Sequence, residues 1–388
     1  MTPQFQRPAL ELAEVIKRHG HRLQNPSGEQ HRILRAIASC RTAALGGHVE
    51  ACDHCHYRRV AYNSCRNRHC PRCQAGACAR WMDDRAEELL PVEYFHVVFT
   101  LPDCLNALAL GNKRVVYGAL FEAAAQTLLE VAANPRHLGA RIGFMSILHT
   151  WGQSLGLHPH LHCVVPGGGL SSDGSRWVSC RPGFLLPVRV LSRVFRGKFI
   201  ALLKHARRRG KLVGAEDEDA FERLLDASVK HDWVVYAKPP FGGPEQVLKY
   251  LARYTHRIAI SNRRLVAVDD RTVTFNYKDY AHGNRPRTMT LDGGEFLRRF
   301  LLHAVPRGFM RIRHFGLLAN CVRTQNLIDC RRLLAAPVTR AQDVCAGLLS
   351  PGSSKPPCCP SCGQGQLRPG ENLGPFQLSR LLARLDSS

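Results

Sequence analysis

The segment HPHLHCVVPGGG, residues 158–169, decides the fold expected for this chain. In a β-strand successive side chains point to opposite faces of the sheet. One face would carry histidines at every second position from His158, together with Val164. The other face would be wholly apolar, with Leu161, Cys163 and Val165. The alternation therefore predicts a strand that packs one face on a core, presents imidazoles on the other and ends at the three glycines.

His160 and His162 are the candidate metal ligands on that strand. Two residues of strand rise separate them by about 6.6 Å, which lets both imidazoles reach one divalent ion. Among the H-x-H pairs of the chain, only this one has an apolar, non-proline centre and continues into a Val-Val run. The pattern alone leaves ordinary strand histidines as the alternative. The same spacing also occurs at residues 19–21, 54–56 and 158–160.

The sequence around this strand predicts a mixed α and β domain. Helical patterns separate the strand-like runs, and such interleaving is typical of α/β or α+β domains. A hairpin is expected to turn at Asp269-Asp270, residues 293–335 read as helical and basic, and 350–375 read as a loose tail. We expect three regions, 1–90, 91–335 and 336–388. The strand-like runs are 95–101, 140–148, 160–168 and 232–240, and the helical ones are 113–133, 187–208 and 216–230.

The charge of the chain predicts a polyanionic partner. Its 388 residues include 54 Lys and Arg against 31 Asp and Glu, a formal net charge of +23. Such an excess favours nucleic acid as the partner. A hydrophobic content of 45% excludes wholesale disorder. We find no signal peptide and no apolar run near the roughly 18 residues of a membrane span, so we expect a cytoplasmic protein without a membrane partner.

The cysteines predict a zinc site near the N-terminus. Sixteen cysteines in a cytosolic chain favour metal binding over disulfides. Two C-x2-C pairs are spaced so that their four thiolates can surround one tetrahedral zinc ion, namely Cys52, Cys55, Cys70 and Cys73. Buried free thiols are the alternative. Further ligand candidates are Cys65, His69 and His48.

Two more features accompany these pairs. Five arginines between residues 58 and 72 predict a metal-supported basic surface for phosphate contacts, with a merely solvated charged face as the alternative. Near the other end of the chain, Cys359-x2-Cys362 has no partner pair unless Cys345 and Cys358 contribute. We expect a structural or vestigial role for that second motif.

Tyr250 and Tyr254 form a second candidate pair. They are four residues apart, about one turn of a helix that would begin behind Gly242-Gly243-Pro244, so both phenols can face one site. They lie at the border between an apolar stripe and a basic face that includes Arg253. Aromatic edge packing with a surface hydroxyl is the alternative for such a pair.

In combination these motifs resemble the HUH endonucleases, specifically the two-tyrosine rolling-circle transposases of bacterial insertion sequences with an N-terminal transposase zinc-binding domain. The resemblance covers most of the chain. Several long matches in the same order are more specific than either short motif. They are residues 48–74, FHVVFTLP at 95–102, HPHLHCVVPGGGL at 158–170, YLARYTHRIAISN at 250–262 and residues 295–320.

This resemblance implies a role for each site residue. His160 and His162 would bind a catalytic magnesium or manganese ion, with Gln246 as the third polar ligand. Tyr250 and Tyr254 would be the nucleophiles, with Arg253 as the basic residue between them. The implied fold is α+β, with an HUH-like central antiparallel sheet, the histidine strand in its middle, the tyrosine helix over it and a small helical zinc-binding domain before it.

The implied activity is DNA transposition. The enzyme would cleave single-stranded or hairpin DNA at the ends of an element through a 5′-phosphotyrosine and then transfer the strand, with a structural zinc in its N-terminal domain. The rivals are a non-catalytic zinc-dependent DNA-binding regulator and a replication initiator or relaxase of the same chemistry. The cysteine-rich N-terminal region favours a transposase. A hydrolase with a histidine metal site is disfavoured because no carboxylate-rich motif accompanies the histidines.

Overall fold

The chain divides into two compact units. The computed structural model describes residues 10–74, 81, 85, 87–238, 246, 259–279, 282–334 and 358–385. Unit 1 combines residues 1–80, 256–304 and 350–388, and unit 2 combines 81–255 and 305–349. This division differs from the three consecutive regions expected from the sequence, because unit 1 is assembled from both ends of the chain and a segment between them.

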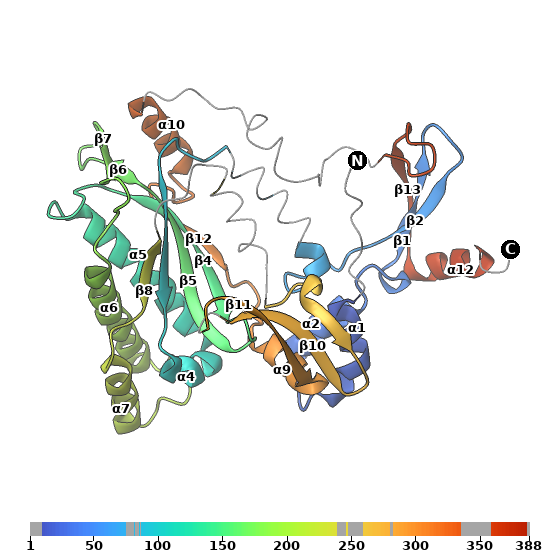
Figure 1. Ribbon diagram of the computed structural model, residues 1–388, viewed down its shortest axis with the longest axis horizontal. Coiled ribbons are helices and arrows are strands. Elements are labelled where there is room, and N and C mark those ends of the chain that lie inside the picture. The colour runs from blue at the N-terminus through green and yellow to red at the C-terminus, as the bar shows by residue number, and fades with distance from the viewer. Residues whose placement is uncertain are drawn as a thin grey trace. The chain divides into compact units, whose positions relative to one another are not determined.

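Unit 2 is built on a five-stranded antiparallel sheet (Figure 1). The strand order is β12-β4-β5-β3-β8, and every neighbouring pair is antiparallel. The histidine strand β5 is the middle strand. The predicted α+β fold with a central antiparallel sheet is therefore confirmed. The strands are β3 (Tyr94–Thr100), β4 (Gly143–Trp151), β5 (Leu157–Pro166), β8 (Val235–Lys238) and β12 (Ile312–Gly316).

Two long helices form the core of unit 2 with one face of this sheet. Helices α5 (Lys113–Ala133) and α6 (Val188–Arg208) lie side by side (Figure 1). The alternate β5 residues Leu161, Cys163 and Val165 are fully buried in the same cluster as residues of both helices. The period-two prediction is thus correct, and the histidines of β5 lie on the face away from this core. The remaining elements of unit 2 are α4 (Asn106–Gly111), β6 (Gly168–Leu170), β7 (Trp177–Ser179), α7 (Glu218–Val229) and α10 (Arg323–Leu333).

Helix α5 is the one described helix that is long and apolar enough to match a membrane span by length and composition. Two thirds of its apolar window, 67%, is buried inside the protein. Tyr117, Leu120 and Phe121 are fully buried in the core of unit 2. The apolar character of α5 is therefore that of a core helix.

In unit 1 two N-terminal helices pack with a hairpin and a later helix. Helix α2 (Gly28–Ala38) begins with a capping box, in which Ser27 and Gln30 each accept a hydrogen bond from the other's backbone N–H. Strands β9 and β10 pair antiparallel around the predicted Asp269-Asp270 turn. The other elements are α1 (Leu12–His19), β9 (Leu265–Val268), β10 (Thr272–Asp279), β11 (Arg285–Asp292) and α9 (Gly293–Leu302).

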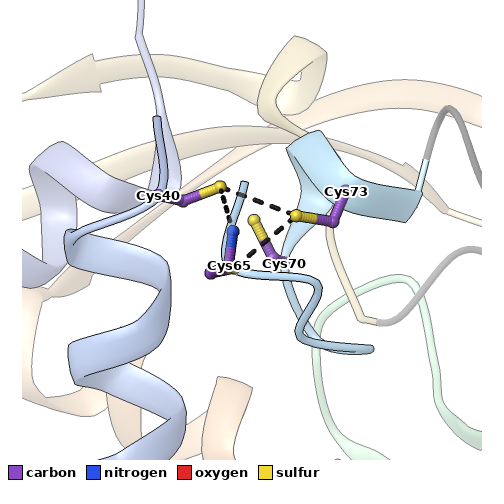
Figure 2. A group of neighbouring side chains, drawn as sticks. All are labelled: Cys40, Cys65, Cys70 and Cys73. Carbon is purple, nitrogen blue, oxygen red and sulfur yellow. Dashed lines mark hydrogen bonds between the residues drawn. The ribbon is translucent and has the colours of Figure 1, made fainter. Parts of the chain in front are cut away.

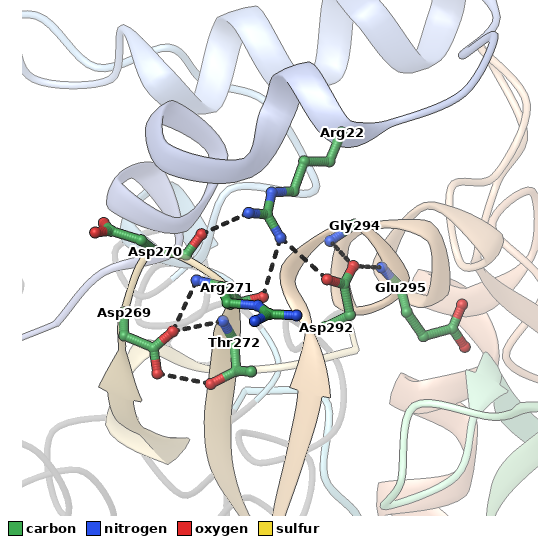
Figure 3. A network of polar contacts seen from close by, with 8 residues as sticks. All are labelled: Arg22, Asp269, Asp270, Arg271, Thr272, Asp292, Gly294 and Glu295. Carbon is green, nitrogen blue, oxygen red and sulfur yellow. Dashed lines mark hydrogen bonds and ion pairs between the residues drawn. The ribbon is translucent and has the colours of Figure 1, made fainter.

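Arg22 joins the end of the first helical segment to this hairpin (Figure 3). Its guanidinium donates to the backbone oxygen of Asp270 at 2.7 Å and to the carboxylate of Asp292 at 3.1 Å. The same Asp292 carboxylate caps α9 by accepting from the N–H groups of Gly294 and Glu295 at 2.8 and 3.3 Å. One arginine thus connects segments about 250 to 270 residues apart in the sequence.

The last part of unit 1 is a small sheet that pairs strands about three hundred residues apart in the sequence. Strand β13 (Leu367–Leu373) pairs antiparallel with β1 (Gly47–Cys52), which also pairs with β2 (Arg58–Tyr62), and α12 (Pro375–Leu385) follows. Residues 367–373 were expected in a loose tail, and that prediction is wrong because β1 offers them a free edge. Likewise 293–335 is not wholly helical, since β12 pairs with the edge of β4.

Candidate metal centres

Three imidazoles converge on one point of the unit 2 sheet. His149 on β4 is the direct register partner of His160 on β5, and His162 lies two residues further along the same face. One nitrogen from each ring lies within 4.8 Å of the others. The Nε2 atoms of His160 and His162 are 3.0 Å apart. Nitrogens that share an ion at metal–nitrogen distances of 2.0–2.1 Å lie about 3 Å apart, so this spacing suits joint coordination.

The outer nitrogens of two of these rings are held by partners within unit 2. His162 Nδ1 lies 2.7 Å from Nε2 of the buried His96 on β3, and His160 Nδ1 lies 2.6 Å from the carbonyl oxygen of His158. Hydrogen bonds of this kind set the tautomer and orientation of metal-binding histidines. Burial lowers the pKa of His160 to about 4, so its ring is neutral at pH 7. A neutral ring has a lone pair to offer a metal.

The sequence pattern did not predict His149 as a metal ligand. The family resemblance implies Gln246 as the third ligand instead. Gln246 is helical and exposed. A signal for His149 was present in the sequence. The predicted strand runs on either side of residues 152–156 are close enough to form a hairpin, and the turn closes with Gly152 N–H donating to the Gly156 oxygen. That hairpin register places His149 opposite His160.

The predicted nucleophiles Tyr250 and Tyr254 and the neighbouring Arg253 lie outside the described residues. The same holds for the predicted start of their helix behind Gly242. Strand β8, which ends at Lys238, is the last described element before them.

Four thiols gather in unit 1 near the C-terminal end of helix α2 (Figure 2). They belong to Cys40, Cys65, Cys70 and Cys73, and all four sulfurs lie within 4.8 Å of one another. Cys73 Sγ is 3.6 Å from the sulfurs of both Cys40 and Cys65. Sulfurs at the corners of a tetrahedron around zinc, each 2.3 Å from the ion, lie about 3.8 Å apart. The group therefore has the dimensions of a closed structural zinc site.

This group corrects the predicted ligand set. Cys70 and Cys73 were expected to share one ion with Cys52 and Cys55, but the structure joins them to Cys40 and Cys65. The reason is the β1–β2 hairpin, which holds Cys52 and Cys55 at its turn, whereas the other pair follows β2. Cys65 was only a further candidate, and Cys40 was not considered because it has no C-x2-C partner.

The two histidines named as further candidates have other contacts. The ring of His69 is hydrogen-bonded to Asn67 at 3.1 Å, and His48 Nε2 lies 3.6 Å from a carboxylate oxygen of Glu50. Neither belongs to a metal-compatible group among the described residues.

The arginines of this region divide into exposed and structural side chains. Arg72 donates to the Glu11 carboxylate at 2.7 Å and to the Cys40 backbone oxygen at 2.9 Å. It therefore helps to fix the backbone that carries the Cys40 thiol. Arg59 pairs with Glu50 at 2.6 Å. Arg58 is exposed on β2. Part of the predicted basic surface is thus used in folding the domain.

Comparison with known proteins identifies the family. A family model described as "Putative transposase" matches residues 143–326, and one described as "Transposase zinc-binding domain" matches residues 12–101. The chain is 54% identical over 379 residues to "Putative transposase y4qJ" of Sinorhizobium fredii, covering 93% of this chain and 95% of that protein. The chain belongs to the two-tyrosine HUH transposase family. The predicted family and its N-terminal zinc-binding domain are confirmed.

Two further comparisons differ in weight. The transposase is 29% identical over 315 residues to the "Transposase for insertion sequence element IS801" of Pseudomonas savastanoi pv. phaseolicola, covering 77% of this chain and 72% of that one. A structure of the conjugative relaxase TrwC with OriT DNA shares 14% identity, with a TM-score of 0.24, over 63% of this chain and 73% of that one. A TM-score this low establishes no common fold. The family models and these relatives thus describe an enzyme of DNA transposition with a zinc-binding domain in its N-terminal part.

Proposed function

We propose that this transposase cleaves and rejoins single DNA strands with Tyr250 and Tyr254 at a divalent ion held by His149, His160 and His162. One observation carries the proposal, namely the convergence of three imidazoles from paired strands of one sheet. Ligands on paired strands keep their spacing through the sheet's backbone hydrogen bonds, which is the pre-organisation a catalytic metal site needs.

The donor set fits a catalytic ion. Three protein ligands leave coordination positions open for substrate oxygens, unlike the closed four-thiol group. Manganese is a transition metal and accepts imidazole nitrogen as a ligand more readily than magnesium does, so of the two expected ions we favour manganese. When bound, the ion supplies charge neutralisation at the scissile phosphate.

The tyrosines perform the covalent chemistry in this proposal. The phenolic oxygen attacks phosphorus, a tyrosine–phosphate bond forms at the 5′ end, and the bond to the 3′ oxygen breaks. The phenol gives up its proton and the released 3′ oxygen gains one. Because the new linkage is still a phosphodiester, the reverse attack by a 3′-hydroxyl rejoins a strand without a nucleotide cofactor. A second tyrosine permits a second cleavage while the first end remains attached.

The substrate follows from charge and from the family. A formal charge of +23 suits the phosphate backbone, and we infer that single-stranded or hairpin ends of an element are bound in the bacterial cytoplasm. Arg253, between the tyrosines, would add positive charge near the attacked phosphate. In unit 1 we assign the structural zinc of the family's domain to Cys40, Cys65, Cys70 and Cys73, in place of the set expected from spacing.

A covalent-adduct assay tests the proposal. Protein is incubated with manganese and a labelled single strand of an element end, and the products are separated on a denaturing gel. Tyr250→Phe and Tyr254→Phe should each remove one adduct, and the double variant should form none. Tyr277→Phe, a half-buried tyrosine of unit 1, is the matched control and should react like the unmodified protein. An adduct that persists in the double variant would show that other residues are the nucleophiles.

A further inference from the structure

A second group of four thiols lies in unit 1 and unites two distant C-x2-C motifs. Cys52 Sγ is 3.8 Å from Cys362 Sγ, and Cys55 Sγ is 3.7 Å from Cys359 Sγ. All four sulfurs lie within 4.8 Å of one another. The expected edge of a zinc–thiolate tetrahedron is about 3.8 Å, so both cross-motif distances have the length that one shared ion requires.

The backbone around both motifs is arranged to stabilise thiolates. The N–H groups of His54 and Cys55 donate to Cys52 Sγ at 3.3 and 3.4 Å. In the other motif the Gly365 N–H donates to Cys362 Sγ at 3.3 Å. Hydrogen bonds to the ionised form of an acid favour that form, and the thiolate is the form that binds metal. In both motifs, therefore, backbone N–H groups donate to a cysteine sulfur, although about 310 residues separate the motifs.

Contacts that involve no sulfur bring the two motifs to the same place. The Asp53 carboxylate accepts from the Gln366 N–H at 2.7 Å and from the Arg368 side chain at 3.1 Å. Strand pairing continues this contact, with Cys52 opposite Leu367. At Gly365, in addition, an added Cβ would lie 2.4 Å from Cys52 Sγ, so glycine is needed where this backbone passes the Cys52 side chain.

We propose that Cys52, Cys55, Cys359 and Cys362 bind a second structural zinc ion, which fastens the 358–385 segment to the N-terminal domain. The match to the zinc-binding family model ends at residue 101, so Cys359 and Cys362 lie outside it. Four thiolates in a closed tetrahedron form a structural site without an open position. The site accounts for the C-terminal motif, whose partner pair was not apparent from its neighbours in the sequence.

The small sheet has a physical need for this ion. In β13 only Leu367 is buried, and the five residues after it are exposed. Strand β2 begins with two exposed residues and has no fully buried one. A sheet that buries so little apolar surface gains little from packing, whereas structural zinc contributes its binding free energy directly to folding.

Zinc content of the full chain tests the site. Because the three histidines can also take up zinc, every protein in the series carries His149→Ala, His160→Ala and His162→Ala. We expect two zinc ions per chain by elemental mass spectrometry in that background. Cys359→Ser with Cys362→Ser should leave one, and so should Cys52→Ser with Cys55→Ser. Cys358→Ser is the matched control, because its exposed thiol is adjacent yet belongs to neither group, and it should retain two.

Cysteine alkylation covers the case in which a variant fails to fold, because it uses the unmodified protein. Native protein is treated with iodoacetamide before and after a zinc chelator, and the peptides are mapped by mass. Cys359 and Cys362 should be protected until zinc is removed, whereas Cys358 in the same peptide should react from the start. One zinc per chain in the triple-alanine background, iron in place of zinc, or early alkylation of Cys359 and Cys362 would each overturn the proposal.

Discussion

The histidine group of unit 2 and the thiol groups of unit 1 place metal ligands in opposite ways. The three histidines come from two adjacent strands within fourteen residues, from 149 to 162, and the sheet positions them through its own hydrogen bonds. The thiols come from separate turns and loops, in one group from both ends of the chain. In unit 2 the sheet positions the ligands by itself. In unit 1 a bound metal contributes to folding. A bound metal can therefore be dispensable for structure in one unit and essential for it in the other.

The largest expected effect is that of removing a ligand from the first thiol group. Cys65→Ser should unfold the N-terminal domain, because structural zinc contributes about 10–16 kcal/mol to the folding of such domains. Hydrogen exchange resolved by mass spectrometry should show loss of protection in α2 and β1 but not in β3 or β5. Cys104→Ser, an exposed cysteine outside both groups, is the control and should change neither. Equal loss of protection in β5 would abolish the contrast between the units.

The next effect distinguishes the two candidates for the third catalytic ligand. His149→Ala should reduce DNA cleavage by about a thousandfold, since a metal supplies several kcal/mol of charge stabilisation and 1.36 kcal/mol is tenfold in rate. Gln246→Ala is the matched variant and should leave cleavage unchanged. Rates are measured by single-turnover gel assay at fixed manganese. The opposite result, a loss with Gln246→Ala alone, would restore the ligand expected from the sequence.

A smaller effect is expected at His96, which contacts a ligand and not the ion. Because its Nε2 lies 2.7 Å from His162 Nδ1, His96→Ala should weaken manganese binding about 10- to 100-fold. Titration calorimetry measures the affinity directly, and cleavage should recover when manganese is raised. Val98→Ala, on the same face of β3, is the control. A cleavage defect that excess manganese does not relieve would indicate a role other than holding His162.

The smallest effect concerns the N-terminal cap of α2, which contributes no metal ligand. Ser27→Ala removes the capping box of α2 and should lower the free energy of unfolding by about 1 kcal/mol. Zinc content should stay the same, because Ser27 belongs to no thiol group. Urea denaturation and elemental analysis measure the two quantities, with the exposed Ser64→Ala as control. Zinc loss in Ser27→Ala would show that the cap of α2 is required to hold the metal site.

The sequence predicts unit 2 better than unit 1, for a physical reason. Period-two alternation identifies β5 and its buried face because a strand's pattern is local to the strand. The pairing of β4 with β5 links residues close in sequence, so even His149 was within reach of prediction. The regular pattern of α5 and α6 likewise gave helices whose bounds lie close to the observed ones.

Which cysteines share one ion in unit 1 depends on long-range contacts that no local sequence pattern predicts. Spacing shows that Cys52 and Cys55 bind as a pair, but it cannot show which other pair they join. The answer lies in the β1–β13 pairing, which brings Cys359 beside Cys55. Cys40 has no nearby cysteine in the sequence, and only the position of α2 brings it to Cys65.

The pairing of β1 with β13 also has a consequence for how the protein is made. Strand β1 leaves the ribosome early, but its neighbour on one side is synthesised only after some three hundred further residues. During translation that edge of β1 is therefore without its native partner, and it closes only when residues 367–373 have emerged. A reading-frame shift or early stop between residues 349 and 367 would yield a chain in which the DNA-processing unit is translated in full while this sheet stays incomplete. Completion of the sheet therefore requires that translation has passed residue 373.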